Sequence, residues 1–286
     1  MADGMDAAER RLNSTRAQLE AVEKELDDWT AGTAQERQSS SVGMLFTLVD
    51  TLYSQILDEA FRDFSPKEKG WEVRLSILHT FLCTAERTST LVADLLFTSD
   101  YTYVAEKLLS DLHAVLYRKH GRVLAYHKSF SDFIFDQDRS GIFWCNQGIH
   151  HRLLANACFR CMKDGLRFNV ANIPSSFVFD VDNPMLADAV EDNIPPVLKY
   201  SCRNWSYHVS AAAPTIPCGL HGSISEFLEL RALFWIEAMT LLHLRSLCGS
   251  MLQTVHDWVI SSQVSFSSFE YPVTNLRCHL EQLVIG

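Results

Sequence analysis

One histidine, His127, lies in the segment "LAYHKSFSDFIFD", which is otherwise mostly apolar and aromatic. A neutral imidazole carries one hydrogen-bond donor and one acceptor, and a rigidly held ring can donate to an anion such as a phosphate. A core histidine whose hydrogen bonds are satisfied is the simpler interpretation of these residues. The elements that surround His127 decide how firmly the ring is held.

A second group of possible ligands consists of His150, His151, Cys158 and Cys161. Histidine rings and cysteine thiolates are the usual ligands of zinc. Helical spacing places both thiols on one face of a helix, beside Leu154, and no second pair of ligands is evident. We therefore expect buried thiols and no metal site. A redox role is not expected either, because the strand-to-helix turn of a thioredoxin-like site is missing.

Motifs that carry out known reactions are missing from the sequence. The phosphate-binding loop pattern, the Gly-x-Gly-x-x-Gly turn, the Gly-x-Ser-x-Gly elbow and the His-Glu-x-x-His pair do not occur. We expect no enzyme, no catalytic residue and no cofactor bound by this chain alone. Acidic pairs such as Asp180 and Asp182 are expected to cap helices or face solvent. Arg203, Asn204 and Trp205 form either a recognition patch or a helix end with Trp205 packed inward.

The composition is that of a folded, acidic protein. Of the 286 residues, 47% are hydrophobic and 21% are charged, which suffices for one large or two small domains. A net charge of -10 argues against partners such as nucleic acid or anionic membranes. No apolar run is long enough to span a membrane, and the acidic start is not a signal peptide. The 8 cysteines have no framework spacing, so reduced thiols and a cytoplasmic location are expected.

Residues 1–43 are expected to form an N-terminal helix followed by a linker. Met5, Leu12, Leu19 and Leu26 recur every seven residues, with Val22 among the companion positions. This pattern fits a short coiled coil, and it also fits a single amphipathic helix packed on the neighbouring domain. The small and polar segment 31–43 is expected to be the linker.

Residues 44–140 are expected to form a winged-helix domain. Helical patterns precede two short extended runs, "VLYR" and "RVLAYHK", which are joined by a glycine-containing connection typical of a hairpin. Thr88 or Ser89 is expected to cap one of the helices. Ser129 and Asp132 have the spacing of a capping box, so we expect Ser129 to cap the next helix. His127 would then lie two residues before the cap, at the end of a strand.

Residues 141–262 are expected to form an irregular helical domain, and residues 263–286 an irregular tail. One helix carries a stripe from Leu154 through Cys158 and Cys161 to Phe168. Pro195 and Pro196 open another helix, and two more are expected at about 223–245 and 250–261. The fold class expected for the whole chain is therefore mainly α.

Several segments together carry a family resemblance: "LYSQILDEAF", "RLSILHTFLCTAERTS", "YHKSFSDFIFD", "NIPPVLKYSCRNW" and "SEFLELRALFWIEAM". Between Leu48 and Ser261 the chain resembles the region that follows the nucleotide-binding core in fungal, basidiomycete-like NACHT proteins. These proteins are STAND-class signalling ATPases similar to NOD-like receptors. In that family the winged-helix histidine of the H-x-S-F motif contacts bound ADP. The resemblance therefore implies that His127 is a candidate ADP-phosphate sensor when a NACHT core is present.

The sequence departs from that family in one respect that decides its chemistry. It has no Walker-type lysine and no magnesium-binding acidic strand, so it should neither hydrolyse ATP nor bind ADP tightly alone. We expect a non-catalytic regulatory or interaction module, encoded separately or left by gene truncation. Its possible partners are a NACHT core in trans or a second copy bound through the N-terminal helix. The alternative is a winged-helix DNA-binding protein, for which Arg118, Lys119 and Arg122 supply little positive charge.

Overall fold

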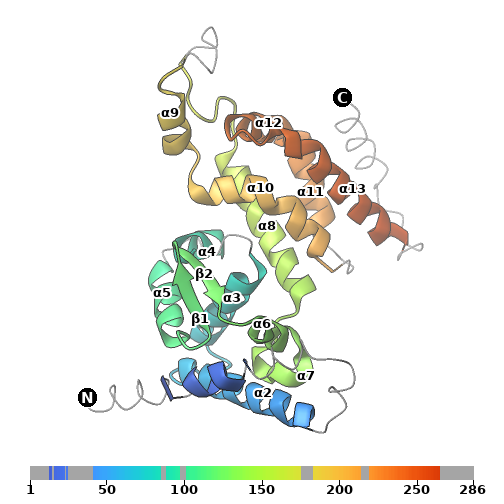
Figure 1. The fold of residues 1–286 in the computed structure, drawn as a ribbon. Helices are drawn as coiled ribbons and strands as arrows, with labels where there is room; N and C mark the ends of the chain where they lie inside the picture. Colours follow the sequence, from blue (N-terminus) through green and yellow to red (C-terminus); the bar gives the residue numbers. More distant parts are fainter. Residues whose placement is uncertain are drawn as a thin grey trace. The chain divides into compact units, whose positions relative to one another are not determined.

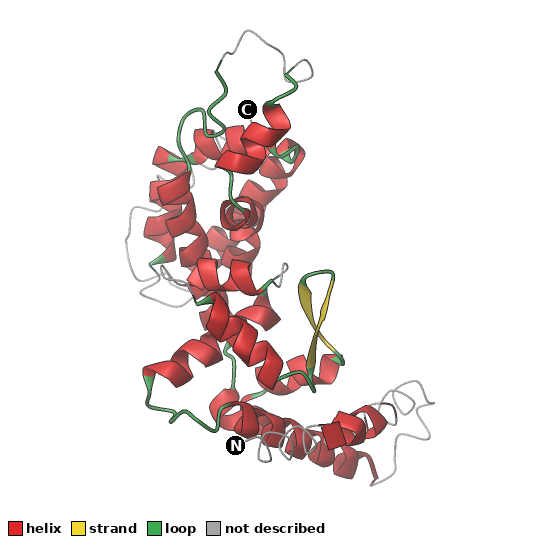
Figure 2. Cartoon of the chain, turned by 90° about the vertical axis from the view of Figure 1, so that its left-hand side faces the viewer, coloured by secondary structure: helices red, strands yellow, loops and turns green. Residues whose placement is uncertain are grey.

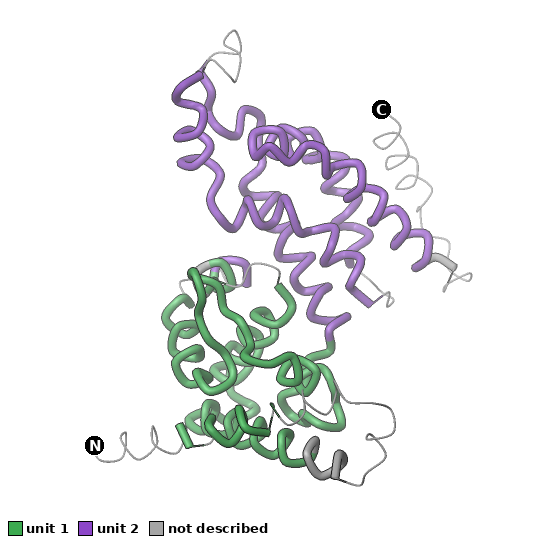
Figure 3. Tube along the Cα trace, in the orientation of Figure 1, with its two compact units in different colours: residues 1–93, 99–146 green, residues 94–98, 147–286 purple. Residues whose placement is uncertain are grey.

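The computed structural model describes residues 13–14, 16–22, 24, 41–84, 88–96, 101–174, 183–213 and 219–264. These residues are mainly helical, with one antiparallel pair of strands among them (Figure 2). The expected mainly α-helical class is therefore confirmed. The chain divides into two compact units (Figure 3). Unit 1 comprises residues 1–93 and 99–146, and unit 2 comprises residues 94–98 and 147–286.

Unit 1 contains helices on both sides of the hairpin in the sequence (Figure 1). In chain order its labelled elements are α2 (Ser41–Ala60), α3 (Lys69–Cys83), most of α4 (Ser89–Leu96), α5 (Thr102–Asp111), β1 (Leu116–Lys119), β2 (Arg122–Ala125), α6 (Lys128–Phe135), α7 (Gln137–Ser140) and the 3-10 helix η2 (Gly141–Phe143). Helix α2 begins inside the segment 31–43 for which we expect a linker. The Thr88 hydroxyl accepts a hydrogen bond from the Leu91 amide at 3.2 Å, so Thr88 caps α4 as expected.

Aromatic rings fill part of the core of unit 1. Phe61 follows α2, Trp71 lies on α3 and Phe143 lies in η2, and the three ring centroids are 4.7 to 5.4 Å apart. Such edge and stacked contacts add to the stabilisation from apolar burial. Because Phe143 packs here, residues 141–146 belong to unit 1, whereas the sequence pattern placed a boundary after residue 140.

A buried ion pair joins α3 to the end of α5. The Arg74 side chain is only 5% exposed, and its Nη2 lies 2.6 Å from the Asp111 carboxylate. The same nitrogen donates to the Ala60 carbonyl at 3.0 Å, at the end of α2. Lys107, which is largely exposed, lies 2.6 Å from the other Asp111 oxygen. Asp111 thus holds three helices of unit 1 together through Arg74.

The N-terminal helix is described only in part, between residues 13 and 24. Leu19 and Val22, two members of the heptad series, are buried within unit 1. In this arrangement these two positions are not available to a coiled-coil partner. Met5, Leu12 and Leu26, the other residues of the seven-residue repeat, lie outside the described residues.

Unit 2 is built from helices of unequal length (Figure 1). They are α8 (Gln147–Gly165), α9 (Leu186–Asn193), α10 (Pro196–Ala211), α11 (Leu220–Leu230), α12 (Ala232–Leu241), the 3-10 helix η4 (Arg245–Leu247) and α13 (Cys248–Val264). The single helix expected at 223–245 is interrupted at Arg231, whose φ of -131° is not helical. Residues 265–286, most of the expected irregular tail, lie outside the described residues.

Helices α8 and α10 pack closely at the centre of unit 2. Gly165 allows this approach, because a Cβ atom there would lie 2.9 Å from a methyl group of Leu198. Trp205 is fully buried, so the inward orientation expected for it is confirmed, although α10 continues to Ala211 and Trp205 is not at its end. Phe168 does not belong to the buried stripe of α8. It is 80% exposed, because the helix ends at Gly165.

Candidate functional site

The hairpin that leads to His127 turns at two residues in the left-handed region. His120 has a φ of 51° and Gly121 a φ of 77°, and Lys119 pairs with Arg122 on either side of them. Positive φ at both central residues is the geometry of the type I′ turn, which matches the twist of paired strands. The short turn fixes the register of β1 and β2. It therefore fixes where β2 ends and where His127 begins the next element.

His127 itself is the N-cap of α6. Its backbone is extended, with φ -134° and ψ 148°, and its Nδ1 accepts a hydrogen bond from the Ser129 amide at 3.1 Å. The expectation that Ser129 caps this helix is therefore wrong. A ring nitrogen takes the place that a serine or aspartate oxygen usually has, because it reaches the second amide of the helix. The helix starts at Lys128 and the ring is bonded to its own helix.

Ser129 links His127 to a different helix. Its hydroxyl oxygen lies 2.6 Å from Nδ1 of His127 and 2.6 Å from the Tyr53 hydroxyl on α2. Tyr53 is fully buried, and its ring packs against Phe130 and Phe133 of α6 at centroid distances of 5.2 and 5.4 Å. The imidazole is therefore held from two sides. A hydrogen-bond chain anchors it to α2, and the amide anchors it to α6.

These contacts assign the proton on the neutral His127 ring. Because Nδ1 accepts the Ser129 amide, its lone pair is in use and the ring proton belongs on Nε2. In this tautomer the ring carries its N–H on the side opposite to Nδ1. The sequence placed His127 near the right position, at a strand end before a helix, but it gave no sign of the tautomer.

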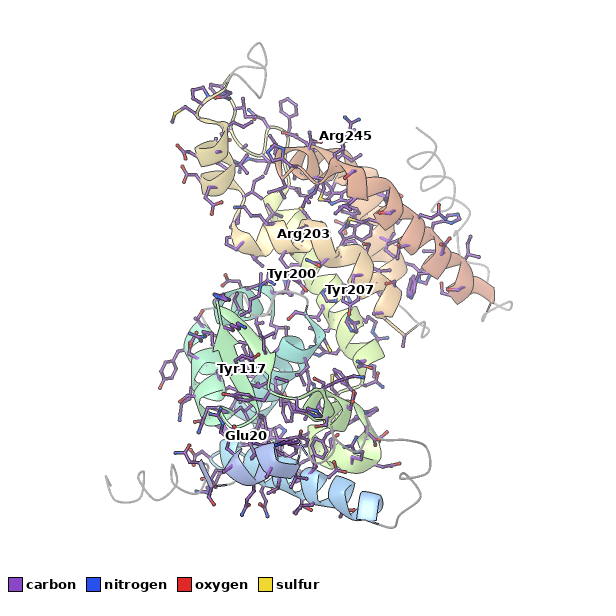
Figure 4. The ribbon with its side chains drawn as sticks, in the orientation of Figure 1. Glu20, Tyr117, Tyr200, Arg203, Tyr207 and Arg245 are labelled. Carbon is purple, nitrogen blue, oxygen red and sulfur yellow. The ribbon has the colours of Figure 1, made fainter. Side chains whose placement is uncertain are left out.

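The N-terminal helix contacts the hairpin beside His127. The Arg16 guanidinium lies 4.4 Å from the centre of the Tyr126 ring and donates to the Tyr126 hydroxyl at 2.6 Å. Arg16 also pairs with Glu20 at 2.9 Å. The Tyr126 ring packs against Tyr117 of β1, at a centroid distance of 4.6 Å. Glu20 and Tyr117 are labelled in Figure 4, on the N-terminal helix and on the hairpin respectively. A cation and an aromatic ring thus pack against Tyr126, the residue that precedes His127 in the sequence.

The histidines and cysteines of the second candidate group do not come together as zinc ligands within unit 2. His151 Nδ1 lies 2.9 Å from Nδ1 of His208 on α10, a residue that sequence reasoning did not single out. Cys158 is buried, and burial raises the pKa of its thiol to about 12. Cys161 is half-buried and its pKa is also raised by burial. A thiol with a raised pKa is rarely a thiolate at neutral pH, so it is a poor ligand and a poor nucleophile.

The pair of His151 and His208 continues into a buried chain on α10. His208 Nε2 lies 2.8 Å from the Tyr200 hydroxyl, and the His208 side chain has no solvent exposure. Burial, with a smaller contribution from nearby His151, lowers the pKa of His208 to about 3. Tyr200, Arg203 and Tyr207 mark the course of α10 in Figure 4. His151, His208 and Tyr200 therefore form a hydrogen-bonded polar network in the core. This network joins α8 to α10.

Comparison with known proteins identifies no relative. No family model, no curated protein and no solved structure matches this chain. Among the described residues, no helix combines the length and the apolar composition required to cross a bilayer.

Proposed function

We propose that this chain is a non-catalytic regulatory and interaction module of the kind that follows the core of NACHT-type signalling ATPases. The family resemblance of the sequence supports this proposal. The order of elements in unit 1 agrees with a winged-helix domain, because helices α3, α4 and α5 precede the hairpin of β1 and β2. The function would be carried out by contact surfaces in the cytoplasm and not by turnover of a substrate.

The geometry of His127 is the observation that carries the proposal. The Ser129 amide and the Tyr53–Ser129 hydrogen bond hold the ring from two elements, which limits its rotation. The resulting tautomer has its proton on Nε2. A preorganised N–H donor binds an anion with little loss of side-chain entropy. A phosphate oxygen of ADP in a docked ATPase core is the acceptor that the resemblance implies.

A single imidazole is too weak to hold a nucleotide by itself. A hydrogen bond to a charged group contributes about 1.5–3 kcal/mol, whereas micromolar affinity requires about 8 kcal/mol. The sequence contains no glycine- and lysine-rich phosphate loop to supply the remainder. We therefore propose that the ATPase core provides the nucleotide site and that His127 adds one contact across the interface. The nucleotide would then strengthen docking of this chain.

Binding of the purified chain to a NACHT ATPase core, with and without ADP, tests the proposal. Complex formation should be stronger with ADP, by about tenfold for one charge-assisted hydrogen bond. The His127→Asn variant should lose this ADP dependence, because an asparagine caps the helix but cannot reach as far as the ring. Calorimetry or analytical ultracentrifugation measures both affinities.

His120→Asn is a matched control for this experiment. It also replaces a histidine by asparagine, in the hairpin turn, where the φ of 51° suits asparagine well. This variant should keep the full ADP dependence. Equal binding with and without ADP, or an ADP effect that survives in His127→Asn, contradicts a phosphate-sensing role.

The alternative, DNA binding through the winged helix, is weakened by ion pairs in unit 1. Lys107 on α5 pairs with Asp111, and Arg118 on β1 pairs with Glu106. These acidic partners reduce the positive potential that a phosphate-tracking surface needs. Retention on duplex DNA that decreases steeply with salt would favour this alternative over the docking module.

A further inference from the structure

A groove with a volume of about 190 Å³ lies in unit 2 between α8 and α11. Phe159 of α8 and Phe227 of α11 line it, with their ring centroids 5.6 Å apart and both side chains largely buried. The Ser223 hydroxyl lies 3.2 Å from the Asn156 side-chain oxygen, and both residues line the same groove. The groove thus combines an aromatic part with polar groups from two helices.

The charged residues of this groove leave an excess of positive charge. Among the described residues, Arg160, Lys163 and Arg231 line it together with one carboxylate, that of Glu226. Three cations and one anion give a formal charge of 3 - 1 = +2, in a chain whose net charge is -10. Lys163 and Glu226 pair at 2.6 Å, and their side chains are 57% and 46% exposed, so solvent and solutes reach this end of the groove.

The two arginines have no carboxylate partner among the described residues. Arg160 donates to the Leu95 carbonyl at 2.9 Å, and Arg231 donates to the Leu230 carbonyl at 3.1 Å. Nε of Arg231 is buried and makes no hydrogen bond within the described part of the chain. Buried donors in folded proteins nearly always have a partner, so the Arg231 guanidinium has hydrogen-bonding capacity that the described residues leave unused. An anion with several acceptor oxygens suits a guanidinium fork best.

We propose that this groove between α8 and α11 binds a phosphate monoester that carries a small aromatic or apolar body. A phosphate monoester has a charge of about -1.5 to -2 and three acceptor oxygens, which matches the net formal charge of +2 that three cationic side chains and one carboxylate give the groove. A carboxylate would leave part of this charge uncompensated. The volume exceeds that of several waters, each about 30 Å³, so it accommodates carbon atoms against the two phenylalanines in addition to the phosphate.

Titration of the full-length chain with phenyl phosphate tests this proposal without any ATPase core. Saturable binding by calorimetry is expected, and benzoate, the matched carboxylate, should bind about tenfold more weakly. Inorganic phosphate should also bind more weakly than phenyl phosphate, because it makes no contact with Phe159 and Phe227. The phosphate ester could belong to a phosphorylated side chain of a protein or to a small metabolite, and a short phosphotyrosine peptide distinguishes these two sources. Tighter binding of the peptide indicates a phosphorylated side chain, and weaker binding indicates a small metabolite.

Two substitutions with opposite expected effects distinguish a change in the binding site from a loss of affinity caused by misfolding. Arg231→Gln removes a cation and should weaken binding of phenyl phosphate about tenfold. Glu226→Gln removes the one carboxylate among the described residues that line the groove and frees Lys163, so it should tighten binding several-fold. A misfolded variant cannot gain affinity. Glu229→Gln is the matched control, because Glu229 lies on the same helix, bonds to Ser225 and does not line the groove.

Three outcomes overturn the proposal. The first is no saturable binding of phenyl phosphate by the folded chain. The second is equal affinity for benzoate, which would make the groove a general anion site. The third is an unchanged affinity in both Arg231→Gln and Glu226→Gln.

Discussion

At the scale of single residues, His127 has a structural task that is separate from any contact with a nucleotide. Its Nδ1 satisfies the Ser129 amide at the start of α6, where the first amides of a helix have no intrahelical partner. Variants of His127 must therefore separate its role as an N-cap from its proposed contact with a phosphate. Asparagine keeps the cap and alanine does not.

We expect His127→Ala to lower the free energy of unfolding by about 0.5–2 kcal/mol, the usual contribution of an N-cap. His127→Asn should stay close to the unsubstituted chain. Urea unfolding followed by circular dichroism measures both values. Equal stability of His127→Ala and the unsubstituted chain would show that the ring does not stabilise α6.

Asp111 allows a similar separation of a buried contact from an exposed one. Asp111→Ala leaves Arg74 buried and without its carboxylate, so we expect a loss of about 3–5 kcal/mol. Lys107→Ala removes the exposed partner of the same carboxylate and should cost less than about 1 kcal/mol. Thermal and urea unfolding of the two variants give the comparison. Similar losses in both would mean that Arg74 finds another partner.

At the scale of elements, the hairpin was predictable because its signal is local. The segment "KHG" between two extended runs contains the glycine that a turn with positive φ requires, and the structure has Gly121 at φ 77°. The open surroundings of Gly121 mean that only backbone strain opposes a side chain there. Substitution at this glycine therefore tests the turn in isolation from packing.

We expect Gly121→Ala to destabilise unit 1 by about 1–2 kcal/mol, the cost of the left-handed region for a residue with a Cβ. His120→Asn should be neutral or stabilising, because asparagine followed by glycine is the preferred sequence of a type I′ turn. Differential scanning calorimetry resolves the two changes. A stable Gly121→Ala variant would indicate that the turn adopts another type.

Other elements could not be predicted, for identifiable reasons. The break at Arg231, whose φ is -131°, has no glycine or proline in the sequence to indicate it. The cap of α6 was assigned to Ser129 because serine is the commoner capping residue, whereas the histidine reaches the amide through its longer side chain. The groove between α8 and α11 joins residues about 67 positions apart, such as Asn156 and Ser223, and periodicity within one helix carries no information about such pairs.

At the scale of the whole molecule, each unit contains a buried histidine that is held neutral. Burial lowers the pKa of His79 in unit 1 to about 4, with its bond to the Phe143 carbonyl opposing the change. Burial also lowers the pKa of His208 in unit 2 to about 3, and His151 adds to the effect. In the unfolded chain both histidines bind a proton near pH 6.5, whereas in the folded chain they bind it only at a much lower pH. Acidification therefore favours the unfolded state of both units.

We expect the free energy of unfolding to fall as the pH decreases from about 6.5 towards 4, because the unfolded state binds more protons in this window. His208→Gln should show a shallower decrease, since glutamine does not titrate. Urea unfolding at a series of pH values, from about 7.5 to about 5, gives the slopes. His120→Asn, at an exposed position, should keep the slope of the unsubstituted chain, and an unchanged slope in His208→Gln would contradict a neutral buried ring.

The cap made by His127 also determines which residues can replace it at this position. Selection for helix initiation alone would accept serine, threonine, aspartate or asparagine there, since each supplies an oxygen to the same amide. A lineage that exchanges these residues freely at the position of His127 would need only the cap. A lineage that keeps histidine alone would be under selection for the opposite edge of the ring, which none of those replacements provides.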